Sequence, residues 1–353
     1  MSIPKIILDC ERIKYPNTGL YHFCIHLGLS LQQFSDAQKE SIYLYLNNAD
    51  RHLFSADSKF IHQHLIHKFL LPNTSSYRIW HSTHQLSQYF PRLSKTKIVL
   101  TIHDLNFLYD TSKSLAKKKS ILQKIQSRID RADEIVSISQ FTLSQVQSHL
   151  QLRDKSCRVI HNGCNIEPMP TLNRPLGAPP TSFLYTIGTI AEKKNFHVLP
   201  SLLVNNDWRL VVSGITQSTS YYEKIITAAQ QQGVADRLIF TGPVSENDKQ
   251  WYMKHCNAFV FPSVAEGFGL PVIEAMYFGK PVILSKHTAL PEIGGAQAYY
   301  FDSFDPSSMQ EVLQKSLRHY AEKDNHNDIV ARANQFSWKN AAMQYLEVYR
   351  TLY

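Results

Sequence analysis

The most chemically suggestive stretch of the sequence runs from Glu266 to Glu274 and reads Glu-Gly-Phe-Gly-Leu-Pro-Val-Ile-Glu. Gly267 and Gly269 let the backbone approach a ligand closely, and Pro271 suits the first position of a helix. The unused N–H groups at the start of such a helix favour an anion. The carboxylate at each end of the stretch can accept hydrogen bonds from sugar hydroxyls beside a bound phosphate.

A second candidate stretch runs from Tyr185 to Phe196 and reads Tyr-Thr-Ile-Gly-Thr-Ile-Ala-Glu-Lys-Lys-Asn-Phe. An apolar strand is expected at its start, followed by Gly188 and by a polar turn that carries Lys193 and Lys194. Two ammonium groups in such a turn can neutralise the charge that develops on a leaving diphosphate.

Each of these features also has a purely structural interpretation. Glu274 can complement a helix dipole, Gly267 and Gly269 can simply form a turn, and adjacent lysines are usually a solvated patch. Gly267-Phe-Gly269 also begins like a dinucleotide-binding fingerprint, but Val272 occupies the place of its third glycine. The combined pattern, rather than any single residue, favours a functional site and argues against a nicotinamide cofactor.

Histidine clusters suggest a different chemistry, a bound metal ion. His62, His64 and His67 are close in sequence, but residues five apart on a helix point about 140° away from each other, so we expect a polar face instead of a ligand set. His81 and His84 can share a face without a third ligand nearby, which favours a structural or acceptor-site role. The sequence contains no Asp-x-Asp pair. We therefore predict no metal site.

Residues 266–283, EGFGLPVIEAMYFGKPVI, resemble the Glu-x7-Glu signature of retaining glycosyltransferases with the two-domain GT-B fold, in the large family numbered four. In that family the first glutamate and the loop amides meet the donor sugar, and the second glutamate holds the ribose hydroxyls. The resemblance implies that the donor contacts of this chain are Glu266, Gly267, Phe268 and Gly269 at the sugar, Leu270 at the phosphates and Glu274 at the ribose.

The stretch around Gly188 is similar to the block Gly-Thr-Leu-x-x-Arg-Lys-Asn of the same family, which is common among its mannosyltransferase-like members. Lys194 matches the lysine that binds the diphosphate. Lys193 stands in place of the usual arginine, and Thr189 stands where many relatives carry another arginine. A lysine cannot form the two-pronged contact of a guanidinium, so the resemblance implies that the phosphates are held mainly by the lysine pair.

Four features of the first half match further landmarks of the family. Pro16-Asn-Thr-Gly-Leu-Tyr21 resembles a glycine loop that approaches the phosphates and the acceptor, with Gly19 as its single glycine. His103, in Thr101-Ile-His-Asp-Leu105, matches a histidine that approaches the donor sugar, although a His-Asp pair at a strand end is equally often structural. Ser139 and Asn162-Gly163 fit two further family positions.

The chemistry that the resemblance implies is departure of a nucleoside diphosphate with retention at the anomeric carbon, without metal or cofactor. Lys193, Lys194 and the helix amides would stabilise the leaving group, while Glu266 and His103 would orient the sugar. GDP-mannose is the first choice of donor, and UDP-hexoses are a close second. The acceptor is expected to be a saccharide or lipid-linked saccharide in bacterial surface polysaccharide or lipopolysaccharide synthesis. A catalytically idle nucleotide-sugar-binding subunit is the alternative.

The hydrophobic pattern predicts the framework that positions these residues. Short apolar runs alternate with segments of helical periodicity, which indicates parallel sheets built from βαβ units. Strands are expected at residues 6–8, 42–46, 98–102, 135–138 and 159–160 in the first half, and at 183–187, 209–212, 238–240, 258–261 and 282–284 in the second. Helices are expected at residues 21–34, 121–132, 222–232 and 271–278.

The fold class is therefore α/β, with two doubly wound Rossmann-like domains that face each other across a cleft. Four of the 16 prolines lie at 170, 175, 179 and 180, which indicates an interdomain linker. We predict an acceptor-binding domain at 1–168, a linker at 169–181 and a nucleotide-sugar-binding domain at 182–335. The family resemblance implies that the last helix, at 336–353, crosses back to pack on the first domain.

The composition and net charge of the chain indicate where the protein acts and which kinds of partner it binds. It has 353 residues and a formal net charge of +8, which favours anionic partners, but no basic-aromatic or helix-turn-helix pattern that would indicate nucleic acid. Its five cysteines show no paired spacing, and the N-terminus does not resemble a signal peptide, so we expect a cytoplasmic protein. A basic amphipathic helix at 115–131 would allow peripheral attachment to the anionic inner face of the cell membrane, although the same pattern fits an ordinary core-facing helix.

Overall fold

The computed structural model describes two compact units. The first unit comprises Met1–Asn165 and Phe336–Tyr353, and the second comprises Ile166–Gln335. The described residues are 3–16, 18–71, 74, 76–91, 95–110, 112–180, 182–323 and 325–353.

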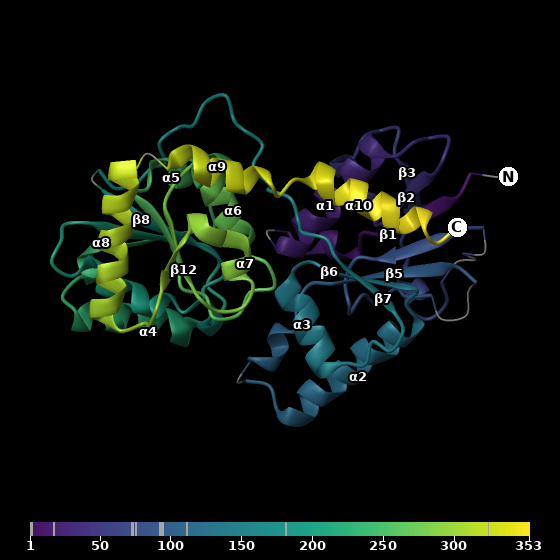
Figure 1. The fold of residues 1–353 in the computed structure, drawn as a ribbon, viewed down its shortest axis with the longest axis horizontal. Coiled ribbons are helices and arrows are strands. Elements are labelled where there is room, and N and C mark those ends of the chain that lie inside the picture. The colour runs from purple at the N-terminus through teal and green to yellow at the C-terminus, as the bar shows by residue number, and fades with distance from the viewer. Residues whose placement is uncertain are drawn as a thin grey trace. The chain divides into compact units, whose positions relative to one another are not determined.

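The first unit is built on a seven-stranded parallel sheet with the strand order β3-β2-β1-β4-β5-β6-β7 (Figure 1). Its strands are β1 (Lys5–Asp9), β2 (Ser41–Leu46), β3 (Lys59–His62), β4 (Ile79–Ser82), β5 (Lys97–Ile102), β6 (Glu134–Ser137) and β7 (Ser156–Val159). Its α-helices are α1 (Gly19–Phe34), α2 (Leu115–Arg131), α3 (Gln140–His149) and α10 (Trp338–Arg350).

The second unit has a six-stranded parallel sheet with the order β10-β9-β8-β11-β12-β13. Its strands are β8 (Phe183–Ile187), β9 (Arg209–Ser213), β10 (Leu238–Gly242), β11 (Ala258–Phe261), β12 (Val282–Ser285) and β13 (Tyr299–Phe301). Its α-helices are α4 (Thr219–Gln231), α5 (Glu246–His255), α6 (Leu270–Tyr277), α7 (Leu290–Gly294), α8 (Pro306–Lys323) and α9 (His326–Asn334).

Both sheets confirm the predicted doubly wound α/β class. In each sheet the strand order reverses once, between β1 and β4 in the first unit and between β8 and β11 in the second. Ligands of such sheets bind beyond the carboxyl ends of the strands at this reversal. The two loops that leave β8 and β11 are the two stretches that the sequence singled out.

The last helix returns to the first unit, as predicted, and packs on α1. Trp338 Nε1 donates to Asn165 Oδ1 at 3.0 Å, and Tyr349 Oη lies 2.6 Å from the buried His81 Nδ1. Near the end of the helix, Arg350 forms two hydrogen bonds with the buried carboxylate of Glu40, at 2.6 and 3.0 Å. These contacts anchor both ends of α10. His81 is therefore a structural residue.

Helix α2 packs its apolar stripe into the core of the first unit. Ile125 and Ile129 are fully buried against β5 and β6 residues, and Ile121 and Leu122 pack against the same cluster. Leu115 alone of the predicted stripe is strongly exposed, at 83%. The apolar stripe is thus occupied by the core, which favours the ordinary interpretation of this helix over a lipid-binding one.

The histidines at 62, 64 and 67 do not share a helix, so the helical interpretation of this segment is wrong. His62 ends strand β3, and His64 and His67 belong to a following turn of 3-10 helix. Strand β3 escaped sequence analysis because its Lys-Phe-Ile-His sequence lies at a sheet edge and has little apolar signal. Among the described residues, no group of three or more His, Cys, Asp or Glu side chains is arranged to hold a metal ion.

The proline-rich segment is attached to the second unit. Asn247 of α5 accepts a hydrogen bond from the Asn173 amide at 3.1 Å and donates to the Thr171 carbonyl at 2.9 Å. Arg174 lies over the Trp251 ring, 6.0 Å from its centroid. The predicted linker at 169–181 is therefore held against α5 at residues 171–174, whereas Leu176 is fully exposed. Thr181 lies outside the described residues.

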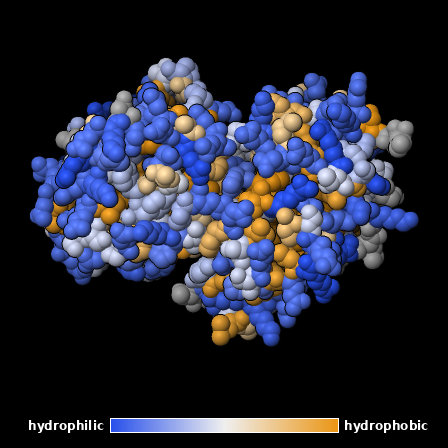
Figure 2. Space-filling view, viewed as in Figure 1, coloured by the Kyte–Doolittle hydropathy of each residue, from blue (hydrophilic) through white to orange (hydrophobic). Residues whose placement is uncertain are grey.

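The described part of the chain contains no helix long and apolar enough to cross a membrane. The face shown in Figure 2 is mostly hydrophilic, with hydrophobic side chains in small patches.

Candidate functional site

A buried ion pair joins the loops that leave β8 and β11. Lys194 lies in a short 3-10 turn, Glu192–Lys194, after β8, and Glu266 lies in the loop between β11 and α6. The Lys194 Nζ–Glu266 Oε1 distance is 2.6 Å, and the two side chains are only 10% and 13% exposed. Since β8 and β11 are neighbours at the strand reversal, the pair lies where a ligand of this sheet is expected.

The surroundings of Glu266 favour its ionised form. Burial alone would raise the pKa of this carboxyl, but Lys194 and Lys193, with hydrogen bonds from Lys194 and Ser263, hold its pKa below the usual range. Burial lowers the pKa of Lys194, while the Glu266 carboxylate acts in the opposite direction. The two groups of such a charge-assisted pair hold each other in a fixed geometry. The pair also places an ammonium group, which attracts anions, at the carboxyl end of the sheet.

Two hydroxyl side chains complete the shell around Glu266. Ser263 Oγ lies 2.6 Å from Glu266 Oε1 and 3.0 Å from the Lys193 carbonyl oxygen. Thr288 Oγ1 accepts a hydrogen bond from the Glu266 amide at 3.1 Å. The Val264 amide donates to the same Lys193 carbonyl at 2.9 Å. Lys193 therefore joins the loops through its backbone, while its side chain is exposed.

Glycines leave the backbone beside Lys194 uncovered by side chains. A Cβ atom on Gly188 would lie 3.1 Å from Lys194 Cε, and a Cβ atom on Gly214, after β9, would lie 2.0 Å from the Gly188 carbonyl oxygen. The Gly214 amide in turn donates to the Gly242 carbonyl at the end of β10, at 2.8 Å. A glycine thus follows β8 and β9 and ends β10, and this close approach excludes any side chain at Gly214.

The start of α6 presents backbone rather than side chains. Gly269 precedes the helix with φ 114°, and a Cβ atom there would lie 2.9 Å from Leu290 Cδ2, so glycine is required. The Phe268 side chain is buried, whereas Leu270, the first helical residue, is partly exposed.

Glu274 is buried within α6 and faces a lysine that sequence analysis missed. Lys249 Nζ, from α5, lies 3.4 Å from Glu274 Oε1 and 2.9 Å from Glu246 Oε2. The side chains of Lys249 and Glu274 are 9% and 5% exposed. Burial opposes the charge on Lys249, but Glu274 and Glu246 outweigh it and raise the pKa of this lysine.

The remaining predicted site residues, Gly19 and His103, belong to the first unit. Gly19 is the exposed first residue of α1, and Thr18 caps the helix by accepting a hydrogen bond from the Tyr21 amide at 3.3 Å. Asn17, in the predicted glycine loop, lies outside the described residues. His103 follows β5 and is buried, with Phe23 of α1 packed edge-on against its ring.

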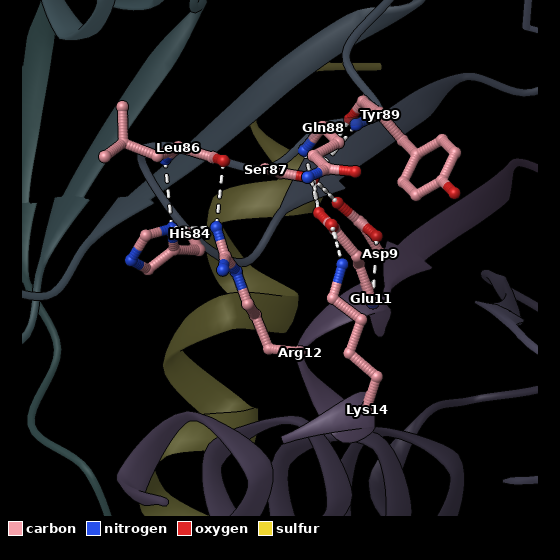
Figure 3. Close-up of polar contacts among 9 residues, drawn as sticks. All are labelled: Asp9, Glu11, Arg12, Lys14, His84, Leu86, Ser87, Gln88 and Tyr89. Atoms are coloured by element: carbon pink, nitrogen blue, oxygen red, sulfur yellow. Dashed lines mark hydrogen bonds and ion pairs between the residues drawn. The ribbon is translucent and has the colours of Figure 1, made fainter. Parts of the chain in front are cut away.

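A polar cluster pins two loops together at the strand reversal of the first unit (Figure 3). Ser87 Oγ hydrogen-bonds to Asp9 Oδ2 and lies 2.9 Å from Glu11 Oε2, which also accepts from the Gln88 amide at 2.7 Å. Lys14 Nζ lies 2.6 Å from Glu11 Oε1. Since Ser87 has one hydroxyl hydrogen for two carboxylates, a second proton is required for both contacts. Burial, and then Glu11, raise the pKa of Asp9 to about 7.

The same loops fix the tautomers of two histidines. His84 Nδ1 accepts hydrogen bonds from Arg12 Nη2 at 2.9 Å and from the Leu86 amide at 3.0 Å, so its ring hydrogen lies on Nε2 (Figure 3). His103 Nε2 donates to the Thr83 carbonyl at 2.8 Å, which makes Nδ1 its acceptor atom. Burial lowers the pKa of His103 to about 4 and that of His84 well below the usual range. Both rings are therefore neutral at physiological pH.

The structure brings together Lys194, Glu266 and Gly188, as expected from a shared site, and adds residues without a clear sequence signal. Ser263 lies two residues after the buried strand β11, which is a position that could have been flagged. Lys249 looks like the exposed partner of Glu246 one helical turn away, and only the packing of α5 on α6 reveals its burial.

Comparison with known proteins shows two family matches. Residues 173–335 match the family described as "Glycosyl transferases group 1", and residues 68–168 match "Glycosyltransferase Family 4". The O-antigen chain mannosyltransferase B of Escherichia coli is 25% identical over 99% of this chain and 100% of its own length. The serotype-specific mannosyltransferase WbdA of Escherichia coli is 28% identical over 72% of this chain, which spans only 34% of that longer relative.

Solved structures share the fold at lower sequence identity. Sucrose-phosphate synthase from Thermosynechococcus elongatus superposes with a TM-score of 0.74 at 18% identity, and the alignment covers 99% of each chain. Anabaena HepE in complex with UDP and glucose has a TM-score of 0.70 at 13% identity, over 99% of this chain and 100% of its own.

Proposed function

Because this chain belongs to family 4 of the glycosyltransferases with the GT-B fold, we propose that it transfers a hexose from a nucleotide-sugar, with GDP-mannose as the first choice, to a saccharide or lipid-linked saccharide. The observation that carries the proposal is the Lys194–Glu266 pair at the strand reversal of the second unit. A cation and an ionised carboxylate held 2.6 Å apart can serve a diphosphate and a sugar hydroxyl side by side.

In the proposed reaction the nucleoside diphosphate leaves and the anomeric configuration is retained, without metal or cofactor. Lys194 and Lys193, with the amides at the start of α6, would stabilise the negative charge on the leaving group. Glu266 would orient the sugar, and Glu274 would hold the ribose. His103 would meet the sugar through Nδ1, because its Nε2 donates to the Thr83 carbonyl.

The relatives support the choice of mannose and of surface polysaccharide synthesis. The full-length match is to a mannosyltransferase of O-antigen chains, and a second O-antigen mannosyltransferase, RfbU of Salmonella typhimurium, is 22% identical over 61% of this chain. A UDP-hexose donor is the second candidate, since HepE was solved with UDP and glucose. A lipid-linked acceptor would bring the basic residues of α2 near an anionic membrane surface.

The direct test is turnover of GDP-mannose, UDP-glucose and UDP-galactose in the presence of EDTA, with lipid-linked saccharides of O-antigen type as acceptors. We expect release of one nucleoside diphosphate and a product whose anomeric configuration, read by NMR, matches that of the donor. Inversion would overturn the retaining mechanism, and activity that depends on added metal would overturn the metal-free one. Binding of a donor without any turnover would support the idle-subunit alternative.

A further inference from the structure

Lys249 is a charged residue on the buried face of α5, beside Gln250, Trp251, Tyr252 and Met253. It lies one turn inside α5, three residues after Glu246, and its side chain is 9% exposed whereas that of Glu246 is 48% exposed. A buried ammonium is costly unless it is paired with an opposite charge. The pairing that explains its burial is with Glu274, 3.4 Å away on α6.

The carboxylate of Glu274 is buried as well, so it too needs an opposite charge nearby. Its side chain is 5% exposed, and a buried carboxyl without a counter-charge tends to take up a proton. A protonated carboxyl donates one hydrogen bond and loses much of its strength as an acceptor. A group that must accept hydrogen bonds from two ribose hydroxyls therefore needs a cation beside it.

We propose that Lys249 is a positioning residue for donor recognition, which holds Glu274 ionised and oriented so that Glu274 can accept hydrogen bonds from the ribose of the nucleotide. The inference rests on the proposed function, because it assigns a role at the same donor site. Lys249 acts through Glu274 and does not contact the nucleotide. Glu246 balances the second side of the ammonium at the protein surface, 2.9 Å from Lys249 Nζ.

The test is discrimination between ribose and deoxyribose. Calorimetric titrations would compare GDP with 2′-deoxy-GDP and 3′-deoxy-GDP, with the UDP series used instead if UDP binds more tightly. Since a hydrogen bond to a charged group is strong, we expect the wild type to prefer the ribonucleotide by about tenfold or more. Lys249→Met should abolish this preference by weakening ribonucleotide binding, and should leave the affinity for the deoxynucleotides within about twofold of wild type.

Three further variants separate positioning from other roles. Lys249→Arg keeps the charge and should retain most of the preference. Lys254→Met makes the same change at an exposed lysine of the same helix and should alter nothing. Glu274→Gln should lose the preference as Lys249→Met does.

The double variant Lys249→Met/Glu274→Gln removes both charges together, so it keeps the test valid if the single lysine variant does not fold. It should bind ribonucleotides as Glu274→Gln does, because two residues that act as one unit are not additive.

The inference is overturned if Lys249→Met retains the full ribose preference, or if it weakens ribonucleotides and deoxynucleotides equally. The second result would mean that Lys249 touches another part of the nucleotide or only supports the fold. A loss in Glu274→Gln without a loss in Lys249→Met would refute the inference and leave the proposed function standing. A wild type that binds no nucleoside diphosphate would overturn both.

Discussion

At the scale of single residues, the second unit places opposite charges where water is largely excluded. Lys194 and Glu266 are both more than four-fifths buried and share a short contact, and Ser263 adds a hydroxyl at the same carboxylate oxygen. Removing one partner of such a pair leaves an uncompensated buried charge, which typically costs about 3–5 kcal/mol. Removal of either partner would therefore affect folding as well as the proposed chemistry, and tests must separate these two effects.

Replacement of Lys194 by Met should lower kcat by about 10²–10³, because one electrostatic partner of the leaving group is lost. Lys193→Met should lower kcat less than Lys194→Met does. The Lys193 side chain is exposed, and this residue joins the two loops through its backbone carbonyl. The measurement is steady-state turnover, with circular dichroism to verify folding. Equal losses in the two variants would contradict the assignment of Lys194 as the main cation.

Replacement of Gly188 by Ala tests the open backbone beside Lys194. The added Cβ would lie 3.1 Å from Lys194 Cε and 3.3 Å from its Nζ, so the ammonium must move by a few tenths of an ångström. We expect nucleotide affinity to fall by about tenfold, or about 1.4 kcal/mol, and the melting temperature to fall as well, because φ at Gly188 is 155°. Gly177→Ala is a matched control, because a Cβ atom there meets nothing within 4 Å. Unchanged affinity in Gly188→Ala would argue against a ligand at this position.

The sequence pattern drew attention to residues of both loops but indicated none of the contacts between them. The spacing of Glu266, the glycines and Glu274 is visible because a loop and a helix start have distinct residue preferences. The pairing of Glu274 with Lys249 could not be predicted, because it depends on how α5 packs against α6 and not on any local pattern. The hydrogen bond from the Glu266 amide to Thr288 could not be predicted either, because Thr288 lies in the next loop.

At the scale of elements, polar clusters fix the loops at the carboxyl ends of both sheets. In the first unit, Asp9 at the end of β1 and Glu11 in the next turn hold Ser87 and Gln88 in the loop after β4. That loop carries His84, whose tautomer is set by Arg12 and the Leu86 amide. The loops of the first unit are thus ordered by buried charge and not by apolar packing alone.

The raised pKa of Asp9 predicts a pH-dependent stability. Because the folded pKa is about 7 and the ordinary value is 3.8, the folded state binds the Asp9 proton more tightly than the unfolded state. The free energy of unfolding should therefore fall as the pH rises from about 4 to about 7, by about 1.4 kcal/mol for each unit of pKa shift at most. Asp9→Asn mimics the protonated acid, so it should remove this component.

Urea unfolding of the wild type and Asp9→Asn at pH 5 and pH 8.5 is the measurement. The unfolding free energy of the variant should exceed that of the wild type modestly at pH 5, where the loss that begins near pH 4 is under way, and by more at pH 8.5. The difference in unfolding free energy between the two proteins cancels the contribution of groups that titrate equally in both. A difference that is the same at both pH values would contradict the protonation of Asp9 in the folded state.

Elements with a strong periodic pattern were predicted from the sequence, and weakly patterned ones were missed. The buried apolar runs of β1, β5, β8 and β11 were recognised because both faces of a parallel sheet are covered. Strands β3, β4 and β13 are four, four and three residues long, and β4 buries His81 and Ser82 in place of apolar residues. Their partners in the sheet, and not their own sequences, stabilise them as strands.

At the scale of the whole molecule, the chain completes its first unit only with its last helix. Trp338, Tyr345 and Tyr349 of α10 are buried in that unit, and Tyr349 contacts the buried His81. The chain leaves the first unit after Asn165 and re-enters it at Phe336, so the second unit is an insertion in terms of chain order. The stability of the first unit should therefore depend on residues that lie at the opposite end of the sequence.

Deletion of residues 336–353 should destabilise the first unit selectively. We expect scanning calorimetry to show loss or a large downward shift of one unfolding transition, while the transition that a bound nucleotide stabilises is retained. Arg350→Ala is a milder variant, because it removes only the contact with the buried Glu40. An unchanged pair of transitions after the deletion would show that α10 is not needed to complete the first unit.

Calorimetric titration with GDP, UDP and ADP in the presence of EDTA decides whether the loops after β8 and β11 form a nucleotide-sugar site. The wild type should bind one of the three, and Glu274→Ala should lose most of that affinity because the ribose contact is gone. If no nucleotide binds at millimolar concentration, or if Glu274→Ala binds as tightly as the wild type, the loops after β8 and β11 do not form the donor site.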